Sequence, residues 1–418
     1  MKVVLINPPS PFLIDQKAFP PLGILYIAAY LRENRIEVEV IDLANQESHL
    51  EETLVKVRGD FIGISTTTPQ YPYARRIKDI INQQNPGIPI IVGGAHPSSL
   101  PAKCLDDGFN TVIAGEGEEA LLKVVKENLR EKLIKISYIS DIDKLPFPAR
   151  DLIDFKSYGY DIEGGKATTI ITSRGCPFKC AFCSKDVWQG KVRFHSIEYV
   201  YNELKEIISK FKIKYFLFLD DSFTLSKRRL IDLCQRIAPL KVKWRCYVSV
   251  RTTDMEMLKI MREAGCVEVG VGIESGSQRI LDIVNKGTTV DKNTEFVLRC
   301  KKIGLLINAF IMIGLPGETY ATVQETKRWM EKARPDKFGF NIFMPYIGTP
   351  VYNNIKDYDL KILDIPEENS WVKGRQEEYH CFVETKELSA QEILRLFKEL
   401  SAYYTELTSW QPGVGNVK

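Results

Sequence analysis

Three cysteines near the middle of the chain have the spacing that most clearly indicates chemistry. Cys176, Cys180 and Cys183 follow a C-x3-C-x2-C pattern, with a glycine directly before the first cysteine and a proline and a lysine before the second. These neighbours are typical of a tight polar loop rather than of a strand or helix. Three thiolates on one short loop can bind a single iron–sulfur cluster. On a four-iron cluster, three protein ligands leave one iron open to a substrate or a cofactor.

The cysteine loop resembles the signature of radical S-adenosylmethionine (SAM) enzymes, including the aromatic Phe182 directly before the third cysteine. In that family the cysteines hold a 4Fe–4S cluster, and its open iron chelates the amino and carboxylate groups of SAM. Reductive cleavage of SAM then yields a 5′-deoxyadenosyl radical that abstracts hydrogen from a substrate. The resemblance implies these cofactors and this reaction class, but it does not indicate the substrate.

The elements that must position this loop alternate between strands and helices. Six βα units follow one another, which predicts a partial (β/α)6 barrel of the TIM type over residues 166–350. Functional residues of such barrels gather on the loops at the carboxyl ends of the strands, and the cysteine loop follows the first strand. The strands are expected at Thr168–Ser173, Tyr215–Asp220, Lys243–Val250, Glu268–Ile273, Leu306–Ile313 and Lys337–Met344.

Residues at these strand ends match positions at which the family binds SAM. A carboxylate at Glu274 could accept hydrogen bonds from the SAM ammonium or ribose, and Arg251 could pair with the SAM carboxylate. Asp220 and its neighbour Asp221 could contact SAM or substrate, or could only cap the next helix. No residue is assigned as a catalytic acid or base. The SAM-binding residues that the resemblance implies are Phe182, Asp220, Arg251, Glu274, Ser275, Met312 and Gly314.

The first 135 residues also alternate between short apolar runs and amphipathic segments. This pattern predicts a doubly wound parallel sheet, Rossmann-like or flavodoxin-like, with right-handed crossovers. Ligands bind such sheets at the carboxyl ends of the strands. The strands are expected at Val3–Asn7, Glu37–Asp42, Phe61–Ser65, Pro89–Val92 and Thr111–Ala114.

Small and hydroxyl-bearing residues at these strand ends would let a bulky ligand approach the backbone. On physical grounds alone they indicate a nucleotide-sized cleft, or an α/β module without a cofactor. The Asn-Pro-Pro, Ser-Thr-Thr-Thr, Gly-Gly-Ala-His-Pro and Gly-Glu-Gly-Glu segments together resemble the cobalamin-binding domain that precedes many radical SAM domains. The cobalamin-binding residues that this implies are Asn7, Pro8, Ser65, Thr66, Thr67, Gly93, Gly94, His96, Gly115 and Glu116.

The Asp-x-His-x-x-Gly motif of histidine-ligated cobalamin does not occur in this part of the sequence. A protein histidine is therefore not expected to bind the lower face of the cobalt through that motif. His96 remains open to two interpretations, because imidazole is a good metal ligand. Packing of the turn is the favoured role.

Length, charge and cysteine usage limit the number of domains and the class of protein. The 418 residues suffice for two or three domains, and a net charge of +3 gives no indication of nucleic-acid binding. Residues 136–165, rich in proline and acidic side chains, are expected to be a linker, and residues 351–418 a small, mostly helical C-terminal cap. No run of about 18 apolar residues predicts a membrane span. Six of the nine cysteines lie outside the loop without paired spacing, which favours a reducing, cytoplasmic location.

Three functions are compatible with these patterns. The first is a cobalamin-dependent methyltransferase acting on an unactivated carbon or a phosphinate phosphorus of a small molecule. The second is a radical cyclisation, rearrangement or C–C bond formation without methyl transfer. The third is an iron–sulfur redox or binding protein without radical turnover, which the SAM-site motifs disfavour. Either enzyme would need an external one-electron reductant of the flavodoxin or ferredoxin type.

Overall fold

The computed structural model describes residues 1–363 and 379–408 of the chain. The described residues form two compact units. Unit 1 holds residues 1–159 and 185–195, and unit 2 holds residues 160–184, 196–363 and 379–408. None of the described helices is both long enough and apolar enough to cross a membrane.

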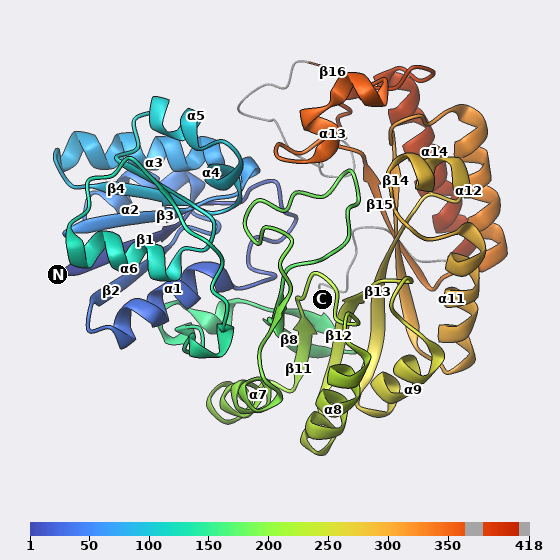
Figure 1. Ribbon diagram of the computed structural model, residues 1–418, viewed down its shortest axis with the longest axis horizontal. Coiled ribbons are helices and arrows are strands. Elements are labelled where there is room, and N and C mark those ends of the chain that lie inside the picture. Colours follow the sequence, from blue (N-terminus) through green and yellow to red (C-terminus); the bar gives the residue numbers. More distant parts are fainter. Residues whose placement is uncertain (364–378, 409–418) are drawn as a thin grey trace. The chain divides into compact units, whose positions relative to one another are not determined.

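Unit 1 is a parallel six-stranded sheet in the order β2-β1-β3-β4-β5-β6 with helices on both faces (Figure 1). Helices α1 and α6 pack on one face through Leu25 and Leu121, and α2 and α3 pack on the other through Leu54 and Ile77. Its elements are β1 (Lys2–Asn7), α1 (Leu22–Glu33), β2 (Glu37–Asp42), α2 (Leu50–Leu54), β3 (Phe61–Ser65), α3 (Tyr71–Gln84), β4 (Ile90–Gly93), α4 (Ala95–Ser99), α5 (Pro101–Asp106), β5 (Thr111–Ala114), α6 (Glu118–Glu127), β6 (Leu133–Lys135) and β10 (Arg193–Phe194).

Unit 2 is a curved seven-stranded sheet in the order β15-β14-β13-β12-β11-β8-β7, in which only β7 is antiparallel to its neighbour. Its elements are β7 (Tyr160–Ile162), β8 (Gly165–Ile170), β9 (Ser173–Arg174), α7 (Ile197–Phe211), β11 (Tyr215–Phe218), α8 (Lys227–Ile237), β12 (Lys243–Val248), α9 (Met255–Glu263), β13 (Cys266–Glu274), α10 (Gln278–Ile283), α11 (Val290–Lys302), β14 (Leu306–Ile313), α12 (Tyr320–Ala333), β15 (Lys337–Ile342), α13 (Pro350–Asn353), β16 (Lys361–Ile362), β17 (Val383–Glu384) and α14 (Ala390–Thr408).

The barrel helices begin at residues whose side chains satisfy free backbone N–H groups. The side chains of Ser196, Ser226, Asp254, Thr289 and Thr319 each accept a hydrogen bond from the backbone N–H three residues later. Polar residues thus fix where each helix starts and how long each loop before it can be.

The predicted α/β class, the parallel N-terminal sheet and the six parallel barrel strands are confirmed. Several elements were not predicted, among them β6 at the edge of the first sheet, β7 within the expected linker, and α10 after β13. The units also divide the chain differently from the expected domains. Residues 136–159 group with unit 1, and so does the segment 185–195 that follows the cysteine loop.

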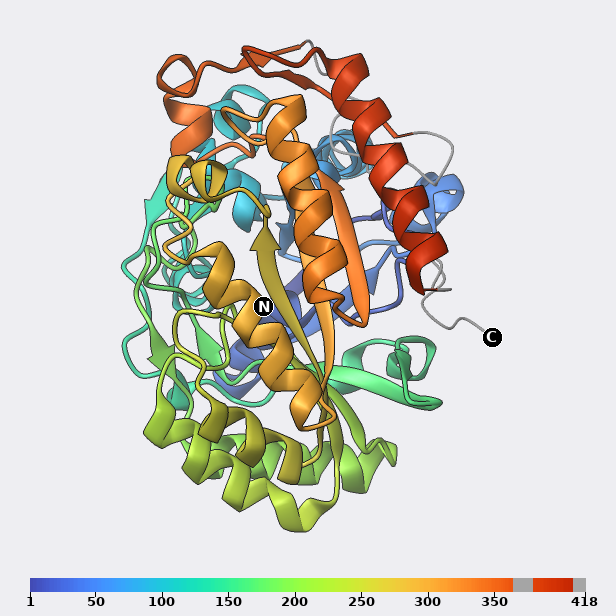
Figure 2. The ribbon, with the colours of Figure 1, turned by 90° about the vertical axis from the view of Figure 1, so that its right-hand side faces the viewer.

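The C-terminal segment was expected to cap the barrel, but its helix α14 packs along the sheet instead. Helix α14, red in Figure 2, contacts β15 and β14. The Tyr404 ring packs edge-on against Phe338 with ring centroids 4.3 Å apart, and its hydroxyl donates to the Asp336 carbonyl. Helix α14 therefore takes the place of the helix that would follow the sixth barrel strand. The expected tail, residues 411–418, lies outside the described residues.

The turn after β14 encloses a carboxyl group that is fully buried. The Glu318 carboxyl accepts a hydrogen bond from the backbone N–H of Gly314, a residue with φ of +92°, and Leu315 also contributes one. Its second oxygen, Oε1, has no hydrogen-bond partner among the described residues. Burial raises the pKa of Glu318 to about 8, and the backbone hydrogen bonds only partly oppose that shift. The side chain is therefore expected to be protonated at neutral pH.

Replacement of this acid by an amide tests the raised pKa. The unfolded chain releases the proton near pH 4.5, whereas the folded chain holds it up to about pH 8. The contribution of protonated Glu318 to the free energy of unfolding of the wild type therefore decreases as pH rises from about 4.5 to about 8. Glu318→Gln keeps a neutral acceptor, so we expect its melting temperature to match wild type near pH 5 and to exceed it near pH 8. A constant difference across this range would contradict a raised pKa.

Candidate functional site

The cysteine loop leaves β9 and is anchored by main-chain contacts within unit 2. The Ala181 N–H donates to the Val284 carbonyl over 2.9 Å, and the Val351 N–H donates to the Ala181 carbonyl over 3.0 Å. The Asn285 amide donates to the Lys179 carbonyl over 3.0 Å. These bonds fix the middle of the loop.

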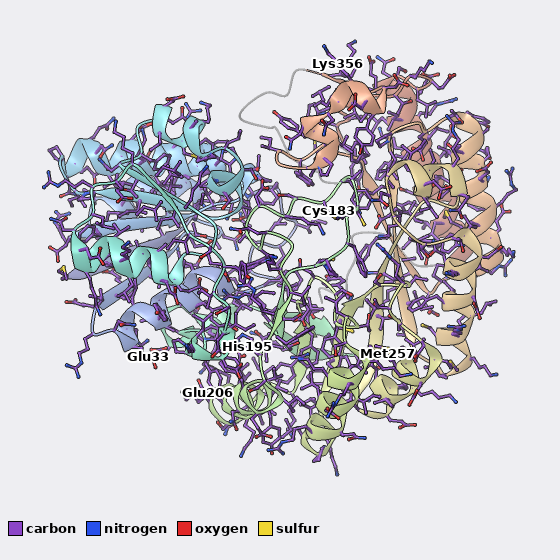
Figure 3. The ribbon with its side chains drawn as sticks, viewed as in Figure 1. Glu33, Cys183, His195, Glu206, Met257 and Lys356 are labelled. Atoms are coloured by element: carbon purple, nitrogen blue, oxygen red, sulfur yellow. The ribbon has the colours of Figure 1, made fainter. Side chains whose placement is uncertain are left out.

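Of the three predicted cluster ligands, two thiols lie in contact. Cys180 is buried, Cys183 is exposed, and the Cys183 N–H donates to the Cys180 carbonyl in a tight turn (Figure 3). Cys176, half-buried on the same loop, is not close enough to form a three-ligand group with them. No such group of histidine, cysteine or acidic side chains occurs within the described ranges.

The electrostatics of the paired thiols favour one thiolate. The hydrogen bond from Cys183 lowers the pKa of Cys180 to about 6, and the cations Lys286 and Arg251 act in the same direction. The same hydrogen bond raises the pKa of Cys183, because a second negative charge would lie against the first. Thiolates near cations are the form in which cysteine binds iron.

Two consecutive carboxylates after β11 accept hydrogen bonds from the segment that leads into the cysteine loop. The Asp220 carboxylate accepts hydrogen bonds from the Thr172 N–H and hydroxyl, both 2.6 Å, and from the Ser173 hydroxyl, 2.7 Å. Asp221 accepts from the Gly175 N–H over 2.9 Å. Burial raises the pKa of Asp220 and these hydrogen bonds oppose the shift. The structure thus engages Asp220, predicted to bind SAM, in internal contacts and leaves it only 2% exposed.

Glu274 ends β13 in the left-handed region, with φ of +68°, and is also paired. Its Oε1 lies 2.6 Å from Lys286 Nζ. The Lys286 ammonium lies 5.6 Å from the centroid of the Phe182 ring. Burial tends to lower the pKa of Lys286, but the Glu274 carboxylate and the Cys180 thiolate raise it overall. Glu274, Phe182 and the cysteine loop therefore meet through Lys286, which sequence reasoning did not single out.

The other predicted SAM residues differ in how accessible they are. Arg251 is exposed and its guanidinium lies 3.9 Å from the centroid of the Phe178 ring in the cysteine loop. Met312 is half-buried in β14, and Gly314 begins the turn closed by Glu318. Ser275 is 1% exposed, because its hydroxyl lies against the Thr326 hydroxyl at 3.2 Å. The structure therefore places Ser275 in helix packing rather than at a ligand surface.

In unit 1, β1 and β3 are the neighbours at which the strand order reverses, and such a point is where doubly wound sheets bind ligands. Gln70, which is 8% exposed, links the two strand ends. Its amide donates to the Pro8 carbonyl and to the Ser10 hydroxyl, and its Oε1 accepts from the Thr67 N–H. Asn7 donates to Asp42 over 2.9 Å.

The ends of β3, β4 and β5 meet closely through small residues. Gly94 has φ of +108°, and a Cβ there would lie 2.6 Å from the Thr66 carbonyl oxygen. Thr66 is 1% exposed, Ser65 and Gly93 pair across the two strands, and the Gly115 N–H donates to the Ser98 hydroxyl. The predicted glycines thus form a backbone edge without side chains, which fits a large flat ligand.

His96 is 5% exposed; its backbone N–H donates to the Thr66 carbonyl at this edge, and its ring packs against Tyr71 of α3. Its ring stacks on Tyr71 with centroids 3.9 Å apart, and Nδ1 lies 3.3 Å from the Thr68 hydroxyl. Burial lowers the pKa of His96 to about 4. Nε2 has no hydrogen-bond partner among the described residues.

Glu116 was predicted to contact cobalamin, but its carboxylate is engaged by protein groups. It pairs with Arg193 and accepts from the Ile139 N–H over 2.6 Å, and both side chains of the ion pair are almost fully buried. Arg193 also lies 5.2 Å from the centroid of the Tyr138 ring. Nearby, buried His195 contacts Asp143 at 3.1 Å (Figure 3). These contacts hold the segment 185–195 within unit 1.

Sequence reasoning missed three polar residues that organise the site: Lys286, Gln70 and Arg193. A signal existed only for Gln70, which stands three residues after Thr67 in the Thr-x-x-Gln spacing of a capping box. The partners of Lys286 and Arg193 are 12 and 77 residues distant, so no local pattern indicates them.

The residues fit the cofactors that the sequence implies. The contacting thiols of Cys180 and Cys183, with Cys176 on the same loop, supply soft ligands beside cations, as an iron–sulfur cluster requires. The Glu274–Lys286 pair offers both charges to a zwitterionic ligand such as SAM. In unit 1, the glycine edge at Gly94 supplies the close backbone approach that a corrin ring needs.

Comparisons with known proteins identify the two domains. Residues 170–330 match the radical SAM superfamily, and residues 16–125 match the B12 binding domain. An uncharacterised methyltransferase of Pyrococcus horikoshii is 33% identical over 84% of this chain and 82% of its own length. The anaerobic magnesium-protoporphyrin IX monomethyl ester cyclase of Cereibacter sphaeroides is 26% identical over 81% of this chain and 61% of its own length.

A solved structure shares the fold. The radical SAM methyltransferase TsrM from Kitasatospora setae, with cobalamin and a 4Fe–4S cluster bound, matches with a TM-score of 0.74 at 18% identity, covering 96% of this chain and 90% of TsrM. With both domain matches and the 33% identical relative, these findings establish the family. The chain belongs to the cobalamin-dependent radical SAM enzymes, whose cofactors are a 4Fe–4S cluster, SAM and cobalamin.

Proposed function

We propose that this radical SAM enzyme is a methyltransferase that methylates an unactivated carbon or a phosphinate phosphorus of a small molecule. The observation that carries the proposal is the 33% identity to a methyltransferase over most of both chains. The presence of both the B12 binding domain and the radical SAM domain supports it. When bound, the cluster and SAM supply a hydrogen-abstracting radical, and cobalamin supplies a methyl carrier.

The chain's own residues would hold and orient these groups. Cys176, Cys180 and Cys183 would ligate the cluster. Glu274 and Lys286 would receive the charged end of SAM, with Arg251 as a further cation. Phe182, Met312 and Gly314 would contact its adenine. Asp220 and Ser275, which are buried in internal contacts, would position the loop and the strand end instead.

In unit 1 the cobalamin site would lie at the strand ends around Asn7, Pro8, Ser65, Thr66 and Thr67. The glycines of the same edge, Gly93, Gly94 and Gly115, would face the corrin ring. Glu116 and His96 would act through packing. An external flavodoxin- or ferredoxin-type reductant would supply the electron.

A second function keeps a specific observation in its favour. A relative that is 26% identical over 81% of this chain is named a magnesium-protoporphyrin ester cyclase, and this name favours ring closure as the second candidate. Radical cyclisation or C–C bond formation would consume SAM only as the radical source, whereas methyl transfer consumes SAM in both roles.

The products of SAM turnover separate the two functions. We expect the reduced, reconstituted enzyme to form S-adenosylhomocysteine together with 5′-deoxyadenosine when it is supplied with its substrate. Substitution of any loop cysteine by alanine should abolish both products and the visible cluster absorbance, whereas Cys234→Ala and Cys300→Ala, at buried thiols far along the chain, should keep both. Formation of 5′-deoxyadenosine alone would exclude methyl transfer.

The hydrogen bonds that Asp220 accepts at the start of the cysteine loop can be tested by substitution. Asp220→Asn would turn an amide N–H₂ toward the Thr172 and Ser173 donors, so at least one donor would lose its acceptor. We expect iron content after reconstitution to fall several-fold, with SAM cleavage falling in parallel. Asp232→Asn, at an exposed carboxylate on α8, is the matched control and should bind iron as wild type does. Full iron content in Asp220→Asn would show that the cysteine loop binds the cluster without the Asp220 hydrogen bonds.

Cobalamin binding can be tested at the glycine edge of unit 1. A methyl group at residue 94 would clash with the Thr66 backbone, so Gly94→Ala should lose the corrin absorption bands after reconstitution with hydroxocobalamin. Cluster content, which depends on unit 2, should remain that of wild type. If Gly94→Ala bound cobalamin with wild-type affinity, the strand ends around Gly94 would not be part of the cobalamin site.

A further inference from the structure

The inner face of the unit 2 sheet is partly exposed although its strands are central. Along β12 and β14, every second side chain is buried against the helices, and the alternate ones remain half-buried. The half-buried residues include Arg245 and Tyr247 on β12 and Asn308 and Phe310 on β14. A central strand normally buries both faces, so this face is built for something other than a closed core.

Two aromatic rings on this face lie over glycines of the neighbouring strands. A Cβ at Gly270 would come within 2.7 Å of the Tyr247 ring and 3.1 Å of the Phe310 ring. A Cβ at Gly339 would come within 2.6 Å of the Phe310 ring from the other side. The two ring centroids are 5.9 Å apart, with an angle of 49° between their planes. The glycines and rings together form an aromatic platform, a surface on which a flat ligand can stack.

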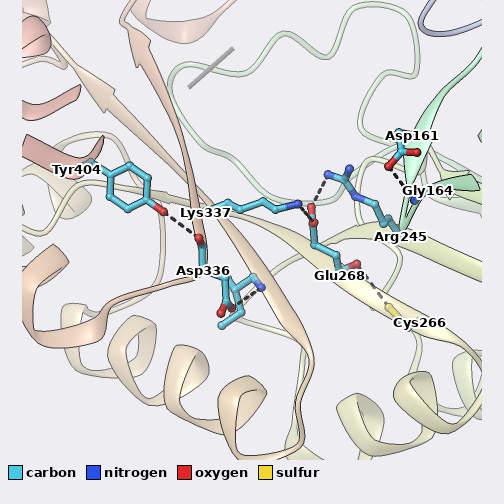
Figure 4. A network of polar contacts seen from close by, with 9 residues as sticks. Asp161, Gly164, Arg245, Cys266, Glu268, Asp336, Lys337 and Tyr404 are labelled. Atoms are coloured by element: carbon cyan, nitrogen blue, oxygen red, sulfur yellow. Dashed lines mark hydrogen bonds and ion pairs between the residues drawn. The ribbon is translucent and has the colours of Figure 1, made fainter. Parts of the chain in front are cut away.

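A group of three charges lies nearer the amino ends of the same strands (Figure 4). Lys337 Nζ lies 2.7 Å from Glu268 Oε2, and Arg245 pairs with the other carboxylate oxygen. The Glu268 side chain is 3% exposed, whereas Arg245 and Lys337 are 20% and 34% exposed. In the described part of the chain, neither cation pairs with a second carboxylate, so the group carries one uncompensated positive charge.

The second cation is not needed to join neighbouring strands through an ion pair. One cation per carboxylate would join two strands, yet two cations from β12 and β15 share the single carboxylate of β13. Arg245 Nε is buried and has no hydrogen-bond partner among the described residues, although the guanidinium lies 5.8 Å from the centroid of the Tyr160 ring. An anionic group placed beside the two cations would take charge-assisted hydrogen bonds and neutralise the group.

We propose that this inner face binds the substrate, and that the substrate is a flat conjugated molecule carrying a carboxylate or phosphate. Its ring system stacks on Tyr247 and Phe310, and its anionic group is received by Arg245 and Lys337. The inference rests on the proposed function, because it names the substrate class of the same enzyme.

The register of β13 also sets a length for the substrate. The register of β13 shifts between Gly272 and Glu274, and the Glu274 carboxylate folds back over Gly272, where it fills the place of a Cβ. Gly272 follows Glu268 by four residues, which corresponds to about 13 Å along the strand. The platform at Gly270 lies between the two. An anionic group at Arg245 and Lys337 would therefore stand on the order of 10–20 Å from the carbon that reacts near the carboxyl end.

The test compares two probes of equal shape on the reconstituted holoenzyme. 2-Naphthoate is flat and anionic, and 2-naphthamide is its neutral counterpart. Equilibrium dialysis of each probe gives its Kd, and we expect naphthoate to bind about tenfold more tightly than naphthamide. Addition of inorganic phosphate should compete with naphthoate but not with naphthamide.

Charge variants separate an anion site from a structural ion pair. Lys337→Met leaves the Arg245–Glu268 pair intact and neutral, so it should remove the preference for naphthoate while keeping the affinity for naphthamide. Glu268→Gln raises the local charge to two and should increase the preference. Lys361→Met, at an exposed lysine paired with Glu384, is the matched control and should bind both probes as wild type does.

Equal affinities for the two probes, no binding of naphthoate, or an unchanged preference in Lys337→Met would each overturn the proposal. A purely structural triad would shift both probes together in Lys337→Met and Glu268→Gln. These outcomes are independent of methyl transfer. An enzyme that prefers naphthoate but forms no S-adenosylhomocysteine would overturn the proposed function alone.

Discussion

The cysteine loop depends on one fully buried carboxylate. Asp220 is held at the end of β11, and β11 is fixed beside β8 by the pairing of Phe218 with Ile170. From that position the carboxylate takes the free donors of Thr172 and Ser173, which would otherwise be buried without acceptors. The chain therefore enters the loop at a place set by sheet register, and main-chain contacts of Ala181 and Lys179 hold the middle of the loop further along.

Those parts of the structure that follow from local patterns could be predicted from the sequence. Alternating apolar runs and amphipathic segments predicted both parallel sheets and most of their strands, and the cysteine spacing predicted the loop. Asp220 shows where such reasoning fails, because a carboxylate at a strand end has the same local sequence whether it faces a ligand or the protein interior. Ser275 and Glu116 fail in the same way. Their partners, Thr326 and Arg193, come from distant parts of the chain, and only packing reveals them.

Glu116 illustrates how a glycine-rich strand end can serve two purposes. Gly115 adopts φ of +109° and presents its backbone at the edge of the sheet, whereas the next residue turns its carboxylate inward to Arg193. A buried ion pair of this kind adds little net stability, yet removal of one partner would leave a buried charge uncompensated. Its effect is specificity, because only a cation at residue 193 satisfies it. The segment 185–195 is thereby fixed in unit 1 immediately after the loop that carries the cluster ligands.

The period of two along the barrel strands explains how one small sheet can serve both cofactor and substrate. Alternate side chains of β12 and β14 lie on opposite faces of the sheet. Packing against the helices constrains the side chains on one face, whereas the side chains on the other face can vary. On the inner face of the sheet, Glu274 lies at the carboxyl end of β13, and Arg245 and Lys337 lie nearer the amino ends of β12 and β15. Substitutions at the amino end could change the substrate without moving Glu274 or the cysteine loop. The differing reactions named for relatives that share this fold are consistent with such a separation.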